Sequence, residues 1–344
     1  MTQNLSVIIP LYNEEKFLPE LFESLKNQDY PKEFTEIIFV DGNSQDNSIK
    51  LLESFKVEYP NLKVLINPEK IVPISMNLGI KEATGKYLIR WDAHSKYAND
   101  YFSKCVEYLE KTDAENVGGP IRLIGDLPVQ KAIMLATTCP FGIGNSSFHY
   151  ENYEGYVDTV YLGAYRKSIF DKIGLYDQEL VRNQDDELNY RLTKNGGKIY
   201  MTPEIKSYYY PRPSLKKLWI QYYQYGYWKV RVIQKHKVPA SIRHLVPGTF
   251  VLSIFLGLLL TCYKGIGLII LIPVLGLYLP ALLFFTIKVG TSQSPVSINN
   301  TYKNLILLAL VFCILHFSYG TGFLKGLYDF YVKKRKKTIQ IKTE

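Results

Sequence analysis

The chain has 344 residues, of which 47% are apolar, so it is long enough for one large domain or two of ordinary size. Its net charge of +9 is concentrated at residues 216–237 and 333–337, each beside a strongly apolar stretch. Positive charge in such positions faces anionic lipid, and no RNA-binding or helix-turn-helix signature accompanies it. The charge therefore predicts a membrane partner and no nucleic acid. The four cysteines show no CxxC spacing, which predicts neither a disulfide framework nor a zinc site.

The first ten residues, MTQNLSVIIP, have no basic segment ahead of their apolar run, which stops at Pro10. We therefore expect no signal peptide and a front domain that stays in the cytoplasm. Residues 6–10 predict a strand, and the apolar spacing from 17 to 25 predicts an amphipathic helix after a polar turn. Further strands, each with a neighbouring helix, are predicted at 36–40, 62–66 and 86–91. Strands that alternate with helices predict an α/β fold with a parallel, doubly wound sheet.

Polar side chains follow three of these strands at the point where each strand ends. They are Asn13 and Glu14, then Asp41, then Asp92 and His94. The carboxyl ends of parallel strands meet at one edge of a sheet, so we expect these side chains to converge on one cleft. No GxGxxG fingerprint or GxxxxGK(S/T) loop follows the first strand, which argues against a nicotinamide dehydrogenase and a P-loop enzyme.

Local structural roles are the alternative for the same residues. Asn13 and Glu14 can begin the next helix, and Asp41 can fix a tight turn with the glycine that follows it. Asp92 can cap a turn beside an exposed His94. The functional interpretation of Asp92 and His94 is a divalent cation, because a carboxylate and an imidazole two residues apart at a strand end can hold one.

A second acidic group lies in the sequence NQDDELNYRL at residues 183–192. Asp185, Asp186 and Glu187 precede an apolar spacing that predicts a helix. Acids in the first turn of a helix also compensate its dipole, so the group by itself leaves both a structural and a functional role open.

From Ser214 the chain changes character. Ser214 can cap a helix in which aromatic residues alternate with lysine and arginine, and residues 214–240 are therefore predicted to form an amphipathic helix at a membrane interface. Packing of these aromatic residues against the front domain is the alternative. Apolar stretches follow at about 245–262, 266–287 and 305–324, each about long enough to cross a hydrocarbon core of roughly 30 Å.

The number of membrane crossings is the next question. Three crossings would place residues 333–337 on the opposite side from the front domain, against the positive-inside tendency. The middle stretch contains Pro273, Gly276 and Pro280 and can form a bent or re-entrant hairpin. We therefore expect an even number of crossings within a membrane region at 241–330, followed by a basic tail at 331–344.

Four motifs occur in a fixed order over roughly the first 215 residues. They are VIIPLYNEE at 7–15, FVDGNSQD at 39–46, MNLGIKEATGKYLIRWDAH at 76–94 and NQDDELNYRL at 183–192. In this order they resemble the motifs of family 2 glycosyltransferases, whose GT-A fold is a Rossmann-like domain for nucleotide-diphospho-sugars. The pattern is most similar to the membrane-bound exopolysaccharide branch typified by succinoglycan glucosyltransferases, with DAH in place of DxD and QD in place of ED. The resemblance implies a catalytic domain at residues 1–213.

The resemblance also implies a donor site. Nucleotide contacts are expected at Pro10, Tyr12, Asn13, Glu14, Asp41, Lys70 and Asn77. For Lys70 and Asn77, a solvated lysine and a turn-capping asparagine are the alternatives. The metal position falls on Asp92 and His94, which would hold Mn²⁺ or Mg²⁺ against the donor diphosphate, unless His94 touches phosphate directly.

On the acceptor side, the resemblance places the general base of an inverting transfer at Asp185. Such a base must reach the acceptor hydroxyl on the face opposite the departing diphosphate. Further acceptor contacts are expected at Gly163, where a substrate can approach the backbone, and at Gln184, Glu187 and Arg191.

The sequence therefore predicts a metal-dependent, inverting hexosyltransferase of the cell membrane, with several membrane passes and a cytoplasmic catalytic domain. It would move a sugar from a nucleotide donor, expected to be UDP-linked, to a lipid-linked saccharide in polysaccharide biosynthesis. Anchoring raises the effective concentration of an acceptor that stays in the bilayer. The alternatives are a polyprenyl-phosphate glycosyltransferase of the same fold and a non-catalytic membrane component that binds saccharide.

Overall fold

The computed structural model describes residues 4–59, 61–144, 147–238, 241–263, 265–291 and 302–334. The chain divides into two units, Met1–Arg122 with Ser147–Tyr209 and Leu123–Ser146 with Tyr210–Glu344. Most of the basic tail predicted at 331–344 lies outside the described residues, from position 335 onward.

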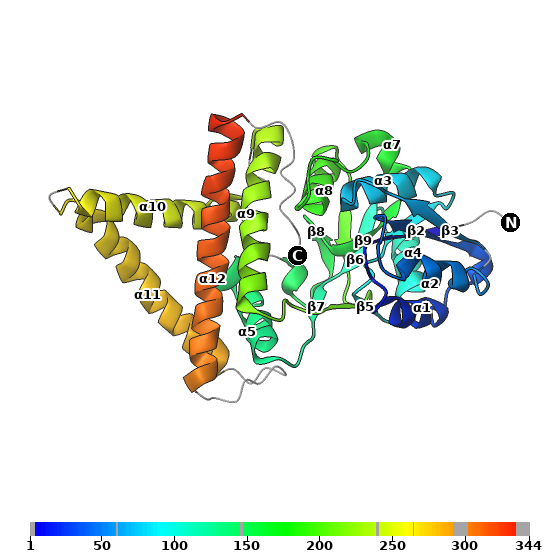
Figure 1. The fold of residues 1–344 in the computed structure, drawn as a ribbon, viewed down its shortest axis with the longest axis horizontal. Coiled ribbons are helices and arrows are strands. Elements are labelled where there is room, and N and C mark those ends of the chain that lie inside the picture. The colour runs from blue at the N-terminus through cyan, green and yellow to red at the C-terminus, as the bar shows by residue number, and fades with distance from the viewer. Residues whose placement is uncertain are drawn as a thin grey trace. The chain divides into compact units, whose positions relative to one another are not determined.

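An eight-stranded sheet forms the centre of the first unit (Figure 1). The first four strands of the chain are parallel neighbours in the order β3-β2-β1-β4. Four further strands continue the sheet as β9-β6-β10-β8, and β9 runs antiparallel to both of its neighbours. The strands are β1 (Leu5–Leu11), β2 (Thr35–Asp41), β3 (Leu62–Ile66), β4 (Tyr87–Arg90), β6 (Asn116–Gly119), β8 (Gly155–Val157), β9 (Tyr161–Arg166) and β10 (Ile199–Met201). The predicted parallel sheet is confirmed for β1 to β4, whereas the complete sheet is mixed.

Successive side chains of β1 point to opposite faces of the sheet, and helices cover both faces. Val7 and Ile9 belong to one apolar core, with α1 (Leu18–Lys26), α2 (Ser48–Phe55) and α4 (Tyr101–Lys111). Ile8 belongs to the other, with α3 (Val72–Glu82), α7 (Ile169–Ile173) and α8 (Gln184–Lys194). Burial on both faces explains why β1 is apolar except at Ser6 and why β2 is apolar from Ile37 to Val40.

Strand register brings the polar turns to one edge of the sheet. Leu11 pairs with Asp41, and Asp41 pairs in turn with Ile66, so β1, β2 and β3 end side by side. Arg90 at the end of β4 pairs with Ile8. The smaller elements are η1 (Lys32–Phe34), η2 (Ser147–His149) and a second sheet in the order β5-β11-β7, formed by Lys96–Tyr97, Ser207–Tyr209 and Ile121–Leu123.

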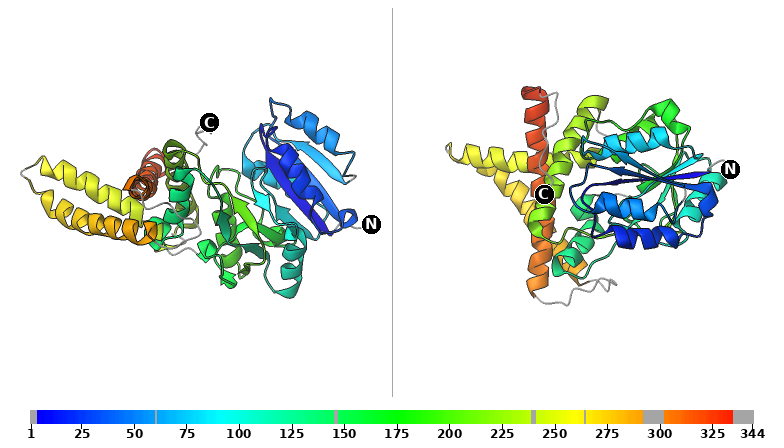
Figure 2. Two further views of the ribbon diagram at one scale, coloured as in Figure 1. Left: turned by 90° about the horizontal axis from the view of Figure 1, so that it is seen from below. Right: turned by 45° about the vertical axis from the view of Figure 1, so that its right-hand side comes forward.

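The described part of the second unit is built from helices (Figure 2). Its core is formed by α5, α9 and α12, which contribute Ala132, Leu218 and Phe312 among other buried side chains. Three helices are long and apolar enough to cross a membrane, at Ile242–Thr261, Leu268–Gly290 and Tyr302–Val332. The helices are α5 (Pro128–Thr137), α6 (Pro140–Ile143), α9 (Leu215–His236), η3 (Ile242–His244), α10 (Val246–Thr261), α11 (Leu268–Gly290), α12 (Tyr302–Leu327) and η4 (Tyr328–Val332).

Glu36 is a buried carboxylate that ties β2 to β1 and to the loop before β4. It accepts hydrogen bonds from the Ser6 hydroxyl at 2.5 Å, from the Thr84 backbone N–H at 2.5 Å and from the Gly85 backbone N–H at 3.2 Å. Burial acts to raise the pKa of Glu36, but the hydrogen bonds from Ser6 and Thr84 outweigh it and hold the pKa below its usual value.

We expect Glu36→Ala to lower the free energy of unfolding by about 2–4 kcal/mol, because it leaves the buried Ser6 hydroxyl and the Thr84 N–H without their acceptor. The exposed Glu53 pairs only with Lys56 three residues later in the described part of the chain. Glu53→Ala should therefore change the free energy by less than about 0.5 kcal/mol. Thermal unfolding of both variants in detergent micelles tests this, and equal shifts would contradict the structural role of Glu36.

Candidate active site

The turns that follow β1 and β2 are hydrogen-bonded to each other. The backbone N–H of Asn13 donates to the Ser44 hydroxyl at 2.8 Å, and Asn13 Oδ1 accepts from the backbone N–H of Gln45 at 2.8 Å. Asn13 adopts a φ of 54°, a left-handed conformation that asparagine tolerates better than most residues. Asn13 thus joins two of the predicted donor-site turns into one rigid loop pair.

Asp41 ends β2 and is fully buried. Its carboxylate accepts from the backbone N–H of Ser44 at 2.7 Å and from the Ser44 hydroxyl at 2.5 Å. Its carbonyl accepts from the backbone N–H of Asn67, just after β3, at 2.7 Å. These bonds show the turn-fixing role that was the structural alternative for Asp41, while a contact with a nucleotide stays a prediction.

An exposed aromatic ring lies beside this buried turn. Tyr12 is 41% exposed, and Lys70 Nζ lies 4.8 Å from the centre of its ring and 3.4 Å from its hydroxyl. Lys70 has a φ of 60°, so the turn after β3 is bent sharply where it presents this lysine. Pro10 lies within β1, paired with Val40. An aromatic face and a cation at this edge can stack on a base and pair with a phosphate.

The turns after β1 and β4 meet at Glu14 and His94. The Glu14 carboxylate lies 3.6 Å from His94 Nδ1, and the ring of Phe17 is 6.4 Å from the imidazole, centre to centre. The predicted convergence of these turns is therefore seen in the structure, with carboxylate and imidazole groups from two strands placed together.

Aromatic packing fixes the turn that carries Asp92. The Tyr97 hydroxyl accepts a hydrogen bond from the backbone N–H of Asp92 at 2.8 Å. Trp91 is fully buried and stacks on Tyr97 with ring centres 3.5 Å apart. The Tyr161 and Ser95 hydroxyls lie 3.1 Å apart at the end of the same turn. The position of the Asp92 backbone is thus set by the core beneath it.

Arg90 connects Asp92 to Asp185. Its guanidinium donates to the Asp92 carboxylate at 3.2 Å through one nitrogen and to the Asp185 carboxylate through the other. Its side chain is only 9% exposed. Burial disfavours the charge, but attraction to Asp185 and Asp92 outweighs it, so the pKa of Arg90 is raised well above its ordinary value. A permanent cation therefore sits between the predicted metal position and the predicted base.

Asp185 lies in the first turn of α8, where its side chain is 38% exposed. Burial raises its pKa and repulsion from Asp92 and Asp186 adds to this effect, whereas Arg90 lowers it. The net direction is upward from the usual aspartate value. A carboxylate with a raised pKa is a stronger base, and its partial exposure leaves it accessible to a hydroxyl group.

Sequence reasoning missed Arg90. The residue ends β4 within YLIRW, an otherwise apolar segment, and it pairs with Ile8 of β1. A charge at such a position is rare unless it is paired, so the sequence contained a signal: a buried cation requires buried carboxylates nearby.

Other predicted acceptor residues have partners within the protein. Glu187 and Arg191 form a two-pronged ion pair with both distances at 2.8 Å, and Arg191 also donates to the carbonyls of Ile173 and Leu175. This pair fixes the loop after α7 to α8, while Gln184 is buried at the start of α8. Contacts of Gln184, Glu187 and Arg191 with an acceptor stay predictions.

Gly163 makes room for a side chain of the neighbouring strand. A Cβ at this position would overlap the amide of Asn116 on β6. Asn116 in turn donates to Asn189 of α8 at 2.9 Å. The space that glycine provides is thus filled by a buried amide, and a close approach of substrate to Gly163 stays a prediction.

Asn77 is buried on α3 and bonds to the backbone of Tyr176. Its Nδ2 donates to the Tyr176 carbonyl at 2.8 Å and its Oδ1 accepts from the Tyr176 backbone N–H at 2.9 Å. Both ends of the amide are thereby used to hold a loop 99 residues away in sequence.

No group of three or more His, Cys, Asp and Glu side chains capable of holding a metal occurs among the described residues. Asp92 offers one carboxylate, and the adjacent Glu14–His94 pair offers oxygen and nitrogen donors. Mg²⁺ at nucleotide sites is typically held by one or two carboxylates together with substrate phosphates and water. The donors present therefore fit an ion that is shared with a diphosphate.

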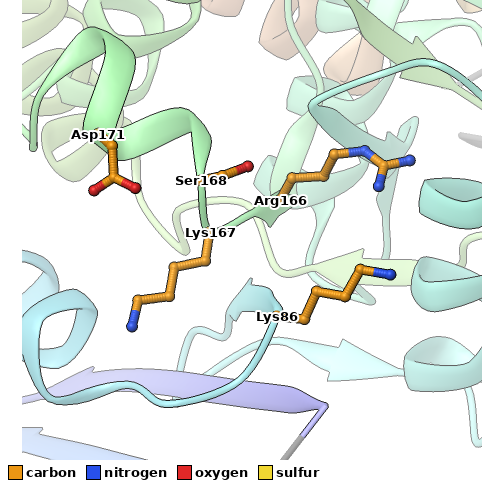
Figure 3. Close-up of a pocket in the computed structure, with 5 residues that line it drawn as sticks. All are labelled: Lys86, Arg166, Lys167, Ser168 and Asp171. Atoms are coloured by element: carbon orange, nitrogen blue, oxygen red, sulfur yellow. The ribbon is translucent and has the colours of Figure 1, made fainter.

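A hollow of about 340 Å³ lies at the opposite edge of the sheet, lined by Lys86, Arg166, Lys167, Ser168 and Asp171 (Figure 3). Its cations have structural partners: Arg166 donates to carbonyls at the end of α4, including Thr112 at 3.2 Å, and Lys167 donates to the Ala83 carbonyl after α3. Such bonds satisfy the last carbonyls of helices. The hollow is therefore separate from the site built by Asp92 and Asp185.

Comparisons with known proteins agree with this geometry. The family model described as glycosyl transferase family 2 matches residues 6–174. Among solved structures, a mannosyltransferase from Pyrobaculum calidifontis in complex with GDP-Man and Mn²⁺ aligns with a TM-score of 0.59 at 16% identity, covering 96% of this chain and 88% of that one. The first unit therefore has the GT-A fold, as predicted.

Two relatives match nearly end to end. One is the dolichyl N-acetyl-alpha-D-glucosaminyl phosphate 3-beta-D-2,3-diacetamido-2,3-dideoxy-beta-D-glucuronosyltransferase of Methanococcus voltae, 32% identical over 94% of this chain and 98% of that protein. The other is succinoglycan biosynthesis protein ExoA of Rhizobium meliloti, 29% identical over 94% of this chain and 95% of that protein. The chain belongs to glycosyl transferase family 2 and is a glycosyltransferase, which confirms the predicted family.

The two bonds to Tyr176 predict the effect of Asn77→Ala. The variant should lower the free energy of unfolding by about 2–3 kcal/mol, because it leaves a buried N–H and a buried carbonyl unpaired. The KM for the nucleotide donor should change less than about threefold if Asn77 acts only through this loop. Unchanged stability together with a strongly raised donor KM would instead support the nucleotide contact predicted from the sequence.

Proposed function

We propose that this glycosyltransferase transfers a sugar with inversion from a nucleotide-sugar, with UDP as the expected nucleotide, to a hydroxyl group of a lipid-linked saccharide. The observation that carries the proposal is the Arg90 bridge, which places the Asp92 and Asp185 carboxylates on either side of one guanidinium. A donor held at Asp92 and an acceptor held at Asp185 would then meet across a short distance, as in-line displacement requires.

Residues at the carboxyl ends of β1 to β3 would bind the nucleotide. The exposed ring of Tyr12 would stack against the base, and Lys70 beside it would pair with phosphate. Asn13 and Asp41 would act by holding the rigid turns that frame this surface, in keeping with their internal hydrogen bonds. Stacking does not distinguish uracil from guanine, so the base is decided by experiment.

Asp92, with His94 and Glu14 beside it, would hold Mn²⁺ or Mg²⁺. When bound, the ion supplies Lewis-acid neutralisation of the diphosphate charge. An imidazole in the set favours a borderline ion such as Mn²⁺.

Asp185 would accept the proton of the attacking hydroxyl. Its raised pKa strengthens it as a base, and Arg90 holds the carboxylate in one orientation. The remaining part of the acceptor site would be formed around the start of α8 by Gln184 and Gly163, with the Glu187–Arg191 pair holding the neighbouring loop.

The acceptor class rests on the two relatives. The name of the Methanococcus voltae protein describes transfer to a sugar on a dolichyl phosphate, and the Rhizobium meliloti protein takes part in succinoglycan biosynthesis. Together these names support a lipid-linked saccharide in envelope or exopolysaccharide assembly as the proposed acceptor of this chain. A polyprenyl-phosphate acceptor is the second candidate, since its phosphate needs little help from a base.

The apolar helices of the second unit support a membrane protein. We propose a multi-pass protein of the cell membrane with its catalytic domain at residues 1–213 in the cytoplasm, an interfacial region at 214–240 and membrane-inserted segments within 241–330. An even number of crossings keeps the basic tail at 331–344 on the same side as the catalytic domain.

The direct test incubates membranes that contain the chain with Mn²⁺, a lipid extract and a panel of radiolabelled UDP- and GDP-sugars. We expect one UDP-sugar to label the lipid fraction, and EDTA to abolish the labelling. Asp92→Ala should reduce it at least about a hundredfold, because charge on the diphosphate is then poorly neutralised.

Asp113→Asn is the matched control, because Asp113 pairs with Lys198 and precedes β6 at the opposite edge of the sheet. It should retain full activity. Full activity of Asp92→Ala in the same assay would overturn the proposed donor site, and intact function in cells would favour a non-catalytic, saccharide-binding role.

Asp185→Asn should lower kcat by about 10²–10⁴-fold, the usual contribution of a general base. In the unchanged protein, kcat/KM should fall as the pH drops through the raised pKa of Asp185. Arg90→Gln removes the group that lowers this pKa, so the acidic fall in activity should move to higher pH.

Measured pH profiles of kcat/KM for the three chains decide between the acceptors. A polyprenyl phosphate needs no base, so full activity of Asp185→Asn would favour that acceptor. An acidic fall that stays at the same pH in Arg90→Gln would contradict the coupling of Arg90 to the base.

A further inference from the structure

We propose that the described part of the second unit enters the hydrocarbon core through the hairpin of α10 and α11, while α12 lies with α9 at the level of the lipid headgroups. This inference refines the proposed membrane association and is independent of the reaction. It differs from a simple count of apolar stretches, by which α12 qualifies as a crossing.

The helices α9 and α12 pack lengthwise and run in the same direction. A Cβ on Gly322 would overlap the Tyr223 carbonyl, and one on Gly326 would overlap the Tyr227 carbonyl, so the two backbones are in direct contact. Farther along, Gln234 Nε2 donates to the Phe330 carbonyl at 3.0 Å. These contacts move toward the C-terminal ends of both helices together. The second half of α12 and α9 must therefore have the same tilt and the same depth in the membrane.

The helix α9 is too polar for the bilayer core. Five cationic residues lie along it: Lys216, Lys217, Lys229, Arg231 and Lys235. The shared end is polar as well, because Asp329 is fully buried, pairs with Lys325 at 2.6 Å and accepts from the Tyr227 hydroxyl at 3.1 Å. Charged groups are costly in hydrocarbon and are readily placed among headgroups. The charged residues therefore favour a position of the α9–α12 pair at the membrane–water interface.

The tip of the hairpin stands away from α12, whereas Tyr278 in the middle of α11 contacts His316 of α12 at 3.1 Å. Pro247 and Val251 of α10 contact Gly320, whereas Gly290 at the end of α11 contacts Leu305 and Leu308. The hairpin thus begins and ends on α12 at two points about 18 Å apart, given about 1.5 Å per residue. With 16 residues, α10 extends about 24 Å, and α11 with 23 residues extends about 34 Å. These lengths require α10 to cross α12 steeply, as Figures 1 and 2 show.

The exposed surface of the hairpin suits lipid chains. Large apolar side chains that are more than half exposed occur on both of its helices: Phe255, Leu258, Leu259, Ile269, Ile272 and Leu277. At its tip, Tyr263 is 65% exposed, in keeping with an aromatic residue at the far headgroups. A reach of about 24 Å brings this tip close to the other side of a core roughly 30 Å thick.

The two ends of the hairpin that lie against α12, here called its feet, both carry cations. Arg243 and His244 come just before α10, Lys288 lies in the last turn of α11, and Lys303 follows in the first turn of α12. Positive charge at both feet places them on the same, cytoplasmic side. Three crossings would place the basic tail on the side opposite the first unit. That conflict is removed when the chain enters and leaves the hairpin from one side.

Cysteine labelling tests the arrangement. In a Cys262→Ser background, Lys303→Cys and Lys334→Cys mark the two ends of the α12–η4 segment, and Lys50→Cys on α2 marks the side of the first unit. A membrane-impermeant maleimide should label all three in inverted vesicles and none in intact cells. If α12 crosses the membrane, Lys303→Cys and Lys334→Cys must be labelled from opposite sides, which would overturn the proposal.

Depth provides a second measurement, with two matched leucines. Leu277 of α11 and Leu310 of α12 are both exposed. After Leu277→Cys or Leu310→Cys, a fluorophore is attached and the chain is placed in vesicles of phosphatidylethanolamine and phosphatidylglycerol. Nitroxides deep in the acyl chains should quench the Leu277 site several-fold more than headgroup nitroxides, with the order reversed at Leu310; deep quenching of both would overturn the proposal.

Both measurements can be repeated in the Asp92→Ala chain. The same labelling and quenching pattern is expected there, because the hairpin does not depend on the donor site. If activity is lost but the labelling and quenching pattern is unchanged, the proposed membrane arrangement is supported. If the pattern changes while activity stays full, only the membrane arrangement is refuted.

Discussion

The guanidinium of Arg90 is the group on which the site depends. A buried cation is tolerated only when its charge is compensated, and here two carboxylates from distant elements do so: Asp92 after β4 and Asp185 at the start of α8. Because each carboxylate is also partly buried, none of the three groups is stable alone. Removing a carboxylate would leave this buried guanidinium with less compensation, so the charges hold together segments that the chain separates by 95 residues.

The same interaction explains why the two carboxylates differ in character. Asp92 lies in a turn whose backbone is held by Tyr97 and by the stacked Trp91 beneath it. Asp185 lies at a helix start, where desolvation and neighbouring acids raise its pKa against the opposing effect of Arg90. In the proposed reaction, these environments would suit Asp92 to ligand binding and Asp185 to proton transfer, as in other sites where paired carboxylates take different roles.

Much of the fold followed from the sequence because burial on both faces makes β1, β2 and β4 apolar runs that end in polar turns. Strand order and direction could not be predicted in the same way. Strand β9 inserts antiparallel between β4 and β6, and the spacing of apolar residues along the sequence does not indicate that pairing. In the site, motif positions predicted roles for Asp92, His94 and Asp185 that stay proposals, whereas partners distant in sequence determine the contacts of the other residues. Asn77 bonds to Tyr176 and Asn116 fills the space above Gly163, contacts that no local pattern encodes. Arg90 was missed because a charge within an apolar strand has meaning only through its partners.

The second unit shows the same limit in a membrane context. Hydropathy evaluates a helix from its own residues, and by that measure α12 is long and apolar enough to cross a bilayer. However, α12 is packed tightly against α9. Glycines bring the backbones of the two helices into contact, and the polar end that they share surrounds Asp329. The free energy of placing α12 in hydrocarbon therefore includes the lysines of α9. The depth of a helix is set by the whole packed layer, and in this layer the charges of α9 outweigh the apolar length of α12.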